Sequence, residues 1–143
     1  MNAKKLIKTY LQSSYAELLN FAFLRYKMFV EHIRNNYDVD PMTLFSGIFF
    51  TVAATDGHFS NKEYEFIKAF SKDMTYELAI ENAKDFYARK EDSKESTIMV
   101  LNSLPNNIKE AVIELCIIIM CVDGNVSYNE SELLKNINQT LNS

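Results

Sequence analysis

The sequence predicts an all-α protein, built as a single bundle of about seven to eight helices. Hydrophobic residues make up 48% of the 143 residues, which is enough to enclose one core. Glycine (3) and proline (2) are scarce, and an all-β fold needs many turns that depend on them. No segment alternates between polar and apolar residues as a strand would. We therefore expect residues 1–143 to form one helical domain.

Residues 1–37 are predicted to form two N-terminal helices. Ser14 and Glu17 make a capping box, in which each side chain accepts a hydrogen bond from the other residue's backbone N–H. This box separates a short helix near 2–12 from a long one near 15–36. Aromatic side chains recur along the long helix: Tyr15, Phe21, Phe23, Tyr26 and Phe29. Such a stripe usually packs in the core, and an oligomer or partner interface is the alternative.

The first of two similar units spans residues 41–71. Asp40 followed by Pro41 is a typical helix start, because aspartate caps the first turn and proline suits the first helical position. The helix that they open, near 41–54, is apolar on most sides and is therefore expected to be central. Gly57 breaks it, since glycine readily ends helices.

The middle of the chain is also predicted to be helical. Helices are expected near 61–71, 74–89 and 93–104. Asp92 or Ser93 is the expected N-cap of the third of these helices, and Pro105 is expected to stop it.

The second unit spans residues 107–140 and begins with another helix that is apolar almost all round, near 107–122. Asn107 and Glu110 are the expected start signals of this helix. Gly124 breaks it, and a last helix runs to the end of the unit.

The two units repeat each other at a shift of 67 residues. When the segment from Asp56 to Lys68 is placed over that from Asp123 to Lys135, six of thirteen positions are identical and three more are apolar in both. Both segments follow the pattern D-G-x-φ-S-x-x-E, where φ is an apolar residue. Each copy follows a strongly apolar helix. Similarity at this level indicates a duplicated helix–loop–helix unit.

The shared motif matches the second half of an EF-hand calcium loop. Its carboxylates are Asp56 and Glu63 in the first copy, and Asp123 and Glu130 in the second. The first half of an EF-hand loop is missing, so a metal site would need both loops to converge. A divalent metal (Ca²⁺, Mg²⁺, Mn²⁺ or Zn²⁺) held by these four residues is one hypothesis. The other is structural, since glycine suits a turn and S-x-x-E is a capping box.

The duplicated motif resembles that of the TerB family of tellurite-resistance proteins. The same fold occurs in the N-terminal region of certain membrane-anchored DnaJ-like co-chaperones. The resemblance rests on residues 54–60 with Glu63, and on residues 121–127 with Glu130. It covers roughly residues 40–140, and the residues before them fit as additional N-terminal helices.

The resemblance implies an all-α bundle with internal pseudo-symmetry and a cytoplasmic role in bacterial stress response, related to tellurite or to phage. It also implies that acidic residues of the loops act as metal ligands or as a docking surface. Carried over to this sequence, those residues are Asp56, Glu63, Asp123 and Glu130. The second copy departs from the family's usual small-residue start, because Met120-Cys121-Val122 precedes its Asp-Gly where the first copy has Ala-Ala-Thr.

Charge is unevenly spread along the chain. Residues 1–37 carry six basic and two acidic side chains, whereas residues 38–143 carry nine basic and seventeen acidic ones. An acidic body argues against nucleic acid binding and suits a basic protein partner. The basic N-terminal part is expected to be a solvated face, with an acidic partner or an anionic membrane as the alternatives.

No membrane span or targeting signal is expected. The longest apolar runs, near 48–54 and 115–122, are too short to cross a bilayer. Cys116 and Cys121 lie in the second run about 140° apart on a helix, so we expect no disulfide between them. Reduced thiols are typical of a cytoplasmic protein.

No enzyme motif is present, since the sequence has no P-loop, no G-x-G-x-x-G and no G-x-S-x-G. His32 is expected on a solvated helix face, and His58 lies in the first loop, where an imidazole would join Asp56 at a transition metal. Two hypotheses follow. One is a TerB-like, non-enzymatic interaction module that binds a divalent metal through its loops. The alternative is a metal-free adaptor or inhibitor, phage- or plasmid-related, that docks a protein partner through its acidic surface.

Overall fold

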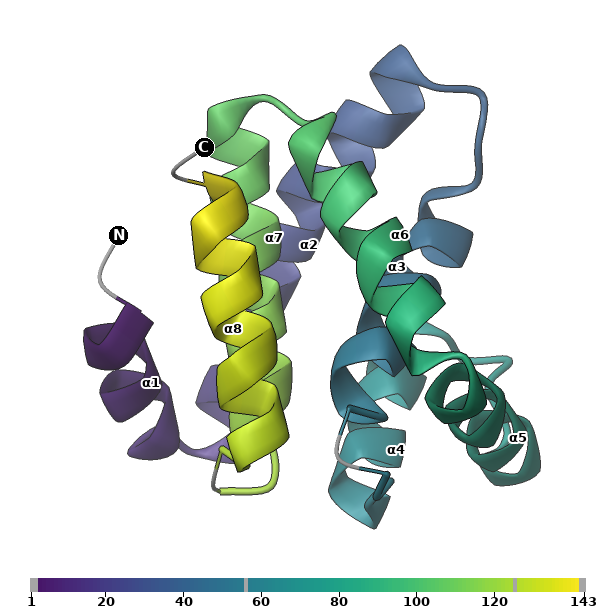
Figure 1. Cartoon of the computed structure of the whole chain (residues 1–143). Coiled ribbons are helices and arrows are strands. Elements are labelled where there is room, and N and C mark those ends of the chain that lie inside the picture. Colours follow the sequence, from purple (N-terminus) through teal and green to yellow (C-terminus); the bar gives the residue numbers. More distant parts are fainter. Residues whose placement is uncertain (1–2, 56, 125, 142–143) are drawn as a thin grey trace.

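The computed structural model describes residues 3–55, 57–124 and 126–141, the last five of them by their backbone alone. These residues form eight helices and no strand, so the predicted all-α bundle is confirmed (Figure 1). The helices are α1 (Ala3–Leu11), α2 (Tyr15–Asn36), α3 (Pro41–Ala53), α4 (Asn61–Phe70), α5 (Tyr76–Ala88), α6 (Lys90–Asn102), α7 (Asn106–Cys121) and α8 (Tyr128–Leu141).

The core is built around α7. Helices α1, α2, α3 and α8 all pack against it, with α2 contacting it most extensively. Every residue of α7 from Ala111 to Cys121 is buried except Glu114. In α3, every residue from Ile48 to its end at Ala53 is buried as well. The prediction that these two apolar helices are central is therefore confirmed.

Helices α5 and α6 cover the other side of α3. α6 bridges the bundle, because it also contacts α7 and α8, whereas α5 lies at the edge (Figure 1). This arrangement leaves the outer face of α5 open.

The aromatic stripe of α2 packs mainly in the core, as predicted. Phe29 is fully buried, and the Tyr26 ring lies 4.9 Å from the rings of both Phe45 and Phe70. Phe23 is the exception, because its side chain is 40% exposed even though its ring lies 4.5 Å from that of Phe70.

Two predicted helix starts are wrong. α6 begins at Lys90 rather than after Asp92 or Ser93, and no side chain caps it. Ser93 instead lies inside the first turn, where its N–H donates to the Arg89 carbonyl at 2.9 Å. α7 starts one residue earlier than expected and also has no capping side chain, because Pro105 occupies the N-cap position with extended backbone angles.

The expected exposure of His32 is also wrong. The His32 and Tyr37 rings lie side by side, with 5.9 Å between their centroids, and His32 is half-buried. Within the described part of the chain, the buried Nε2 has no hydrogen-bond partner. The described ranges contain no helix that is both long and apolar enough to cross a membrane.

Candidate functional site: the paired loops

The loops between α3 and α4 and between α7 and α8 have the same backbone geometry. The Gly57 N–H donates to the Ala54 carbonyl at 3.0 Å, and the Gly124 N–H donates to the Cys121 carbonyl at 3.0 Å. Both glycines have positive φ, at 76° and 86°, a conformation that side chains disfavour. Equivalent bonds at a spacing of 67 residues show that the sequence repeat is a structural repeat.

The serine and glutamate of each motif form a capping box. The Ser60 N–H donates to Glu63 Oε1 at 2.9 Å, and the Glu63 N–H donates to Ser60 Oγ at 3.1 Å. Ser127 and Glu130 form the same pair of bonds, at 2.9 and 3.2 Å. Glu63 is only 2% exposed and Glu130 only 6%. These bonds confirm the two predicted capping boxes, and in both of them the glutamate is buried.

A side-chain hydrogen bond joins the two loops. Ser60 Oγ donates a hydrogen bond to Asp123 Oδ1, which joins residues 63 positions apart. Since Ser60 caps α4, the Asp123 carboxylate lies at the N-terminus of that helix, where the helix dipole favours negative charge. The two motifs thus form one composite site, which we call the paired loops.

The surroundings of the two loops differ. A Cβ placed on Gly57 would lie 3.0 Å from the Tyr87 ring of α5, whereas a Cβ on Gly124 would have no atom within 4 Å. Beside the first loop lies a cavity of about 160 Å³, lined in part by His58, Lys84 and Tyr87.

A cavity of about 280 Å³ lies beside the second loop. Its lining includes Tyr15 from α2, Lys62 and Glu65 from α4, and Cys121 and Gly124 from the loop region. Each loop thus borders a different hollow of the molecule.

The two thiols are buried and held protonated. Cys116 and Cys121 are free. Burial raises the pKa of Cys116 to about 12. Burial also raises the pKa of Cys121 to about 12, and the charge of nearby Glu130 contributes to that rise. Because the thiolate is the reactive form, neither thiol is a nucleophile at neutral pH.

The described carboxylates do not form a metal site on their own. Asp56, the fourth residue of the predicted set, lies outside the described residues. Of Glu63, Asp123 and Glu130, each already has one oxygen engaged in a hydrogen bond of the paired loops. Among the described residues, no three histidine, cysteine, aspartate or glutamate side chains lie close enough together to hold a metal ion. The four-residue metal site therefore stays a prediction that depends on Asp56.

Sequence reasoning missed two long-range interactions, one in the paired loops and one between α2 and α7. One is the Ser60–Asp123 bond. The other is the half-buried ion pair between Arg25 of α2 and Glu114 of α7, with Arg25 also donating to the Phe21 carbonyl at 3.0 Å. Both join residues far apart in the chain, and no local pattern signals such contacts.

Comparison of the chain with models of protein families, with curated proteins and with solved structures found no match. The paired loops are therefore interpreted from their own geometry.

Proposed function

We propose that this protein is a non-enzymatic interaction module of the TerB-like type, acting in the bacterial cytoplasm in stress response and docking a basic protein partner. The main support for docking is the outer face of α5, which combines acidic and aromatic side chains that the rest of the fold leaves exposed. In this proposal the paired loops hold the two units together, since their polar groups are engaged with one another.

The acidic side chains of the proposed docking face are Glu77, Glu81 and Asp85, and all three are exposed. Within the described part of the chain, only Asp85 of these forms an ion pair, with Arg89 at 2.7 Å. Helix α6 carries three further exposed acids, Glu91, Asp92 and Glu95, of which Glu91 pairs with Lys94 at 3.7 Å. Such a field attracts a basic partner and speeds its association.

Apolar side chains on the same helix supply contact area. Tyr76, Leu78 and Tyr87 of α5 are each between 43% and 45% exposed. Tyrosine is enriched at protein interfaces because its ring is apolar and its hydroxyl forms hydrogen bonds. A basic, amphipathic partner segment would complement this face, because its basic side chains would pair with the acids and its apolar side chains would contact the rings.

The test uses a fluorescein-labelled amphipathic peptide of lysine and leucine as the probe, with binding followed by fluorescence anisotropy. The double variant Glu77→Lys/Glu81→Lys should weaken binding by about tenfold or more, because like charges then face each other. The matched control is Glu31→Lys/Glu110→Lys, which makes the same charge change at exposed positions of α2 and α7. The control should keep most of the affinity. Equal losses in both variants would mean attraction to net charge alone, and would reject the docking face.

A divalent metal at the paired loops is a second candidate, favoured by the Ser60–Asp123 bond, because a site needs the two loops to meet. The test measures the melting temperature of chelator-treated protein with millimolar Ca²⁺, Mg²⁺, Mn²⁺ or Zn²⁺. An ion that binds only the folded state raises the melting temperature. A metal site in the paired loops would be supported if Asp56→Asn or Asp123→Asn abolished the rise in melting temperature. The helix-cap control Asp40→Asn should keep that rise. No rise with any ion would leave the metal-free adaptor.

A further inference from the structure

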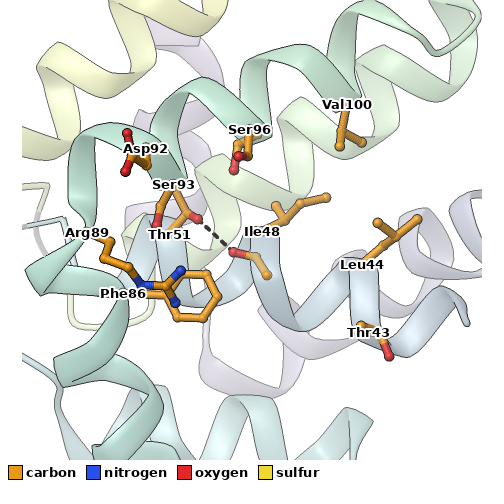
Figure 2. Close-up of a pocket in the computed structure, with 12 residues that line it drawn as sticks. Thr43, Leu44, Ile48, Thr51, Phe86, Arg89, Asp92, Ser93, Ser96 and Val100 are labelled. Carbon is orange, nitrogen blue, oxygen red and sulfur yellow. Dashed lines mark hydrogen bonds between the residues drawn. The ribbon is translucent and has the colours of Figure 1, made fainter.

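A third cavity, of about 220 Å³, lies between α3 and α6, away from the paired loops. Figure 2 shows Leu44 and Ile48 of α3 facing Ser93, Ser96 and Val100 of α6 across it. Helices in contact usually fill the space between them with interlocking side chains. Here the facing positions leave a hollow instead.

The floor of this cavity is Gly47, in the middle of α3. Its backbone does not require glycine, because positive φ occurs only at Gly57 and Gly124 among the described glycines. Packing does not require it either, since a Cβ on Gly47 would have no atom within 4 Å. Glycine inside a helix is less stable than alanine. The missing side chain therefore costs helix stability and gives the cavity its depth.

The α6 wall carries hydroxyl groups that the protein leaves unpaired. Thr97 lines the cavity and is only 4% exposed, yet its hydroxyl has no hydrogen bond to any described residue. Ser93 and Ser96 lie on the same face of α6, and their hydroxyls likewise have no partner in the described ranges. By contrast, the Thr51 hydroxyl on α3 donates to the Gly47 carbonyl at 2.7 Å. The Thr97 hydroxyl is not among the enclosed polar atoms of the described residues that lack a partner, so it is accessible from the cavity, where it can exchange a hydrogen bond with water or with a ligand.

The middle of the cavity is apolar, and its charged lining residues are Arg89 and Asp92. Leu44, Ile48 and Val100 line the middle. At one end, the Arg89 guanidinium lies over the Phe86 ring, 5.8 Å from its centroid, and pairs with Asp85. A charged ligand would have to compete with that ion pair. An uncharged ligand would not.

We propose that this cavity binds a small, uncharged, largely apolar molecule: a single substituted ring with one hydrogen-bonding group. The hydrogen-bonding group would meet the Thr97 hydroxyl, and the ring would lie over Gly47. An apolar cavity of about 150 Å³ is large enough to bind benzene. The cavity here, at about 220 Å³, has room for a ring with substituents.

The experiment titrates the whole protein with p-cresol and with toluene, two probes of similar shape of which only p-cresol has a hydroxyl, and follows backbone amide signals by NMR. Both probes should cause saturable shifts at residues of α3 and α6, and p-cresol should bind more tightly. Thr97→Val keeps the side-chain shape and removes the hydroxyl. It should weaken p-cresol severalfold and leave toluene unchanged.

Gly47→Leu should fill the cavity and abolish binding of both probes, whereas Gly47→Ala, the matched control, should keep binding. Circular dichroism would check that each variant is folded. If Gly47→Leu does not fold, the ratio of p-cresol to toluene affinity in Thr97→Val still decides the question. Absence of saturable shifts, equal effects of Thr97→Val on both probes, or binding that survives in folded Gly47→Leu would each overturn the proposal.

Discussion

The two helix–loop–helix units share their turn and cap hydrogen bonds but use equivalent helix positions for different purposes. Position 47 of α3 is a glycine that forms the floor of a cavity, and the equivalent position of α7 is Glu114, which pairs with Arg25 of α2. Position 51 is a threonine beside the same cavity, and its equivalent is the fully buried Ile118. At these positions α7 is tightly packed in the centre of the bundle, whereas α3 borders the cavity.

The repeated motif therefore specifies the turn, while the neighbouring helices determine the surroundings of each copy. Tyr87 of α5 covers Gly57, whereas a Cβ added to Gly124 would have no atom within 4 Å. Substitutions at equivalent positions of the two units should therefore have unequal effects.

The largest expected effect comes from the cores of the two units. Phe50 and Ile117 occupy equivalent positions and are almost fully buried. Phe50→Ala should lower the free energy of unfolding by about 3–5 kcal/mol, and Ile117→Ala by about 2–5 kcal/mol. Urea unfolding of each variant should show one transition, since both helices belong to one core. Two separate transitions in either variant would show that the units fold independently.

The next effect concerns the bond that joins the loops. Ser60→Ala removes both a helix cap and the bond to Asp123, and should cost about 2–3 kcal/mol of unfolding free energy. Ser14→Ala removes an equivalent but exposed capping box and should cost about 1 kcal/mol. A double-mutant cycle of Ser60→Ala with Asp123→Ala should give a coupling of at least about 0.5 kcal/mol. If Ser60→Ala and Ser14→Ala lowered the unfolding free energy equally, and the cycle showed no coupling, the bond between Ser60 and Asp123 would contribute nothing to stability.

The glycines of the two loops should differ as well. Gly57→Ala and Gly124→Ala each force a side chain into positive φ, which costs about 1–2 kcal/mol. Gly57→Ala should cost about 1 kcal/mol more, because the new methyl group meets the Tyr87 ring. Thermal unfolding followed by circular dichroism would measure both. If Gly57→Ala were no more costly than Gly124→Ala, Tyr87 would not constrain the first loop.

The smallest expected effect is a loss of stability at alkaline pH. The folded pKa of each thiol is about 12, above the ordinary value of 9.0. The unfolded chain therefore loses its thiol protons first. The contribution of each thiol to stability is full well below pH 9, and it falls as pH rises through 9 toward 12. Between pH 7 and 9 each thiol should remove about 0.4 kcal/mol. Cys121→Ala, which copies Ala54 of the first unit, should show about 0.4 kcal/mol less of this loss in urea unfolding. If Cys121→Ala left the pH dependence of stability unchanged, the Cys121 thiol would not be a source of the alkaline loss.

Much of the fold was predictable because its signals are local. The capping boxes at Ser14 and Ser60 and the start at Asp40-Pro41 each lie within about one turn of chain. The repeat at 67 residues is visible because two short segments can be compared directly. The starts of α6 and α7 were wrong because no side chain caps them, so the sequence carries no marker there.

The candidate site was only partly predictable. The buried capping roles of Glu63 and Glu130 were anticipated as one of two alternatives, and the structure bears them out. The partner of Asp123 was not anticipated, because a hydrogen bond across 63 positions depends on how the helices pack. The cavity over Gly47 was missed for the same reason, since a glycine inside an apolar helix gives no sign of what faces it.

The bond between Ser60 and Asp123 also bears on the order of folding. It closes a long segment of chain, and the entropy of closing that segment must be overcome before the bond can form. The helices themselves depend on contacts close in sequence, which form fast. We expect the bond to form late, after the transition state, so that losing it speeds unfolding and leaves the folding rate nearly unchanged. The paired loops would then act as a latch that sets how long the folded molecule lasts.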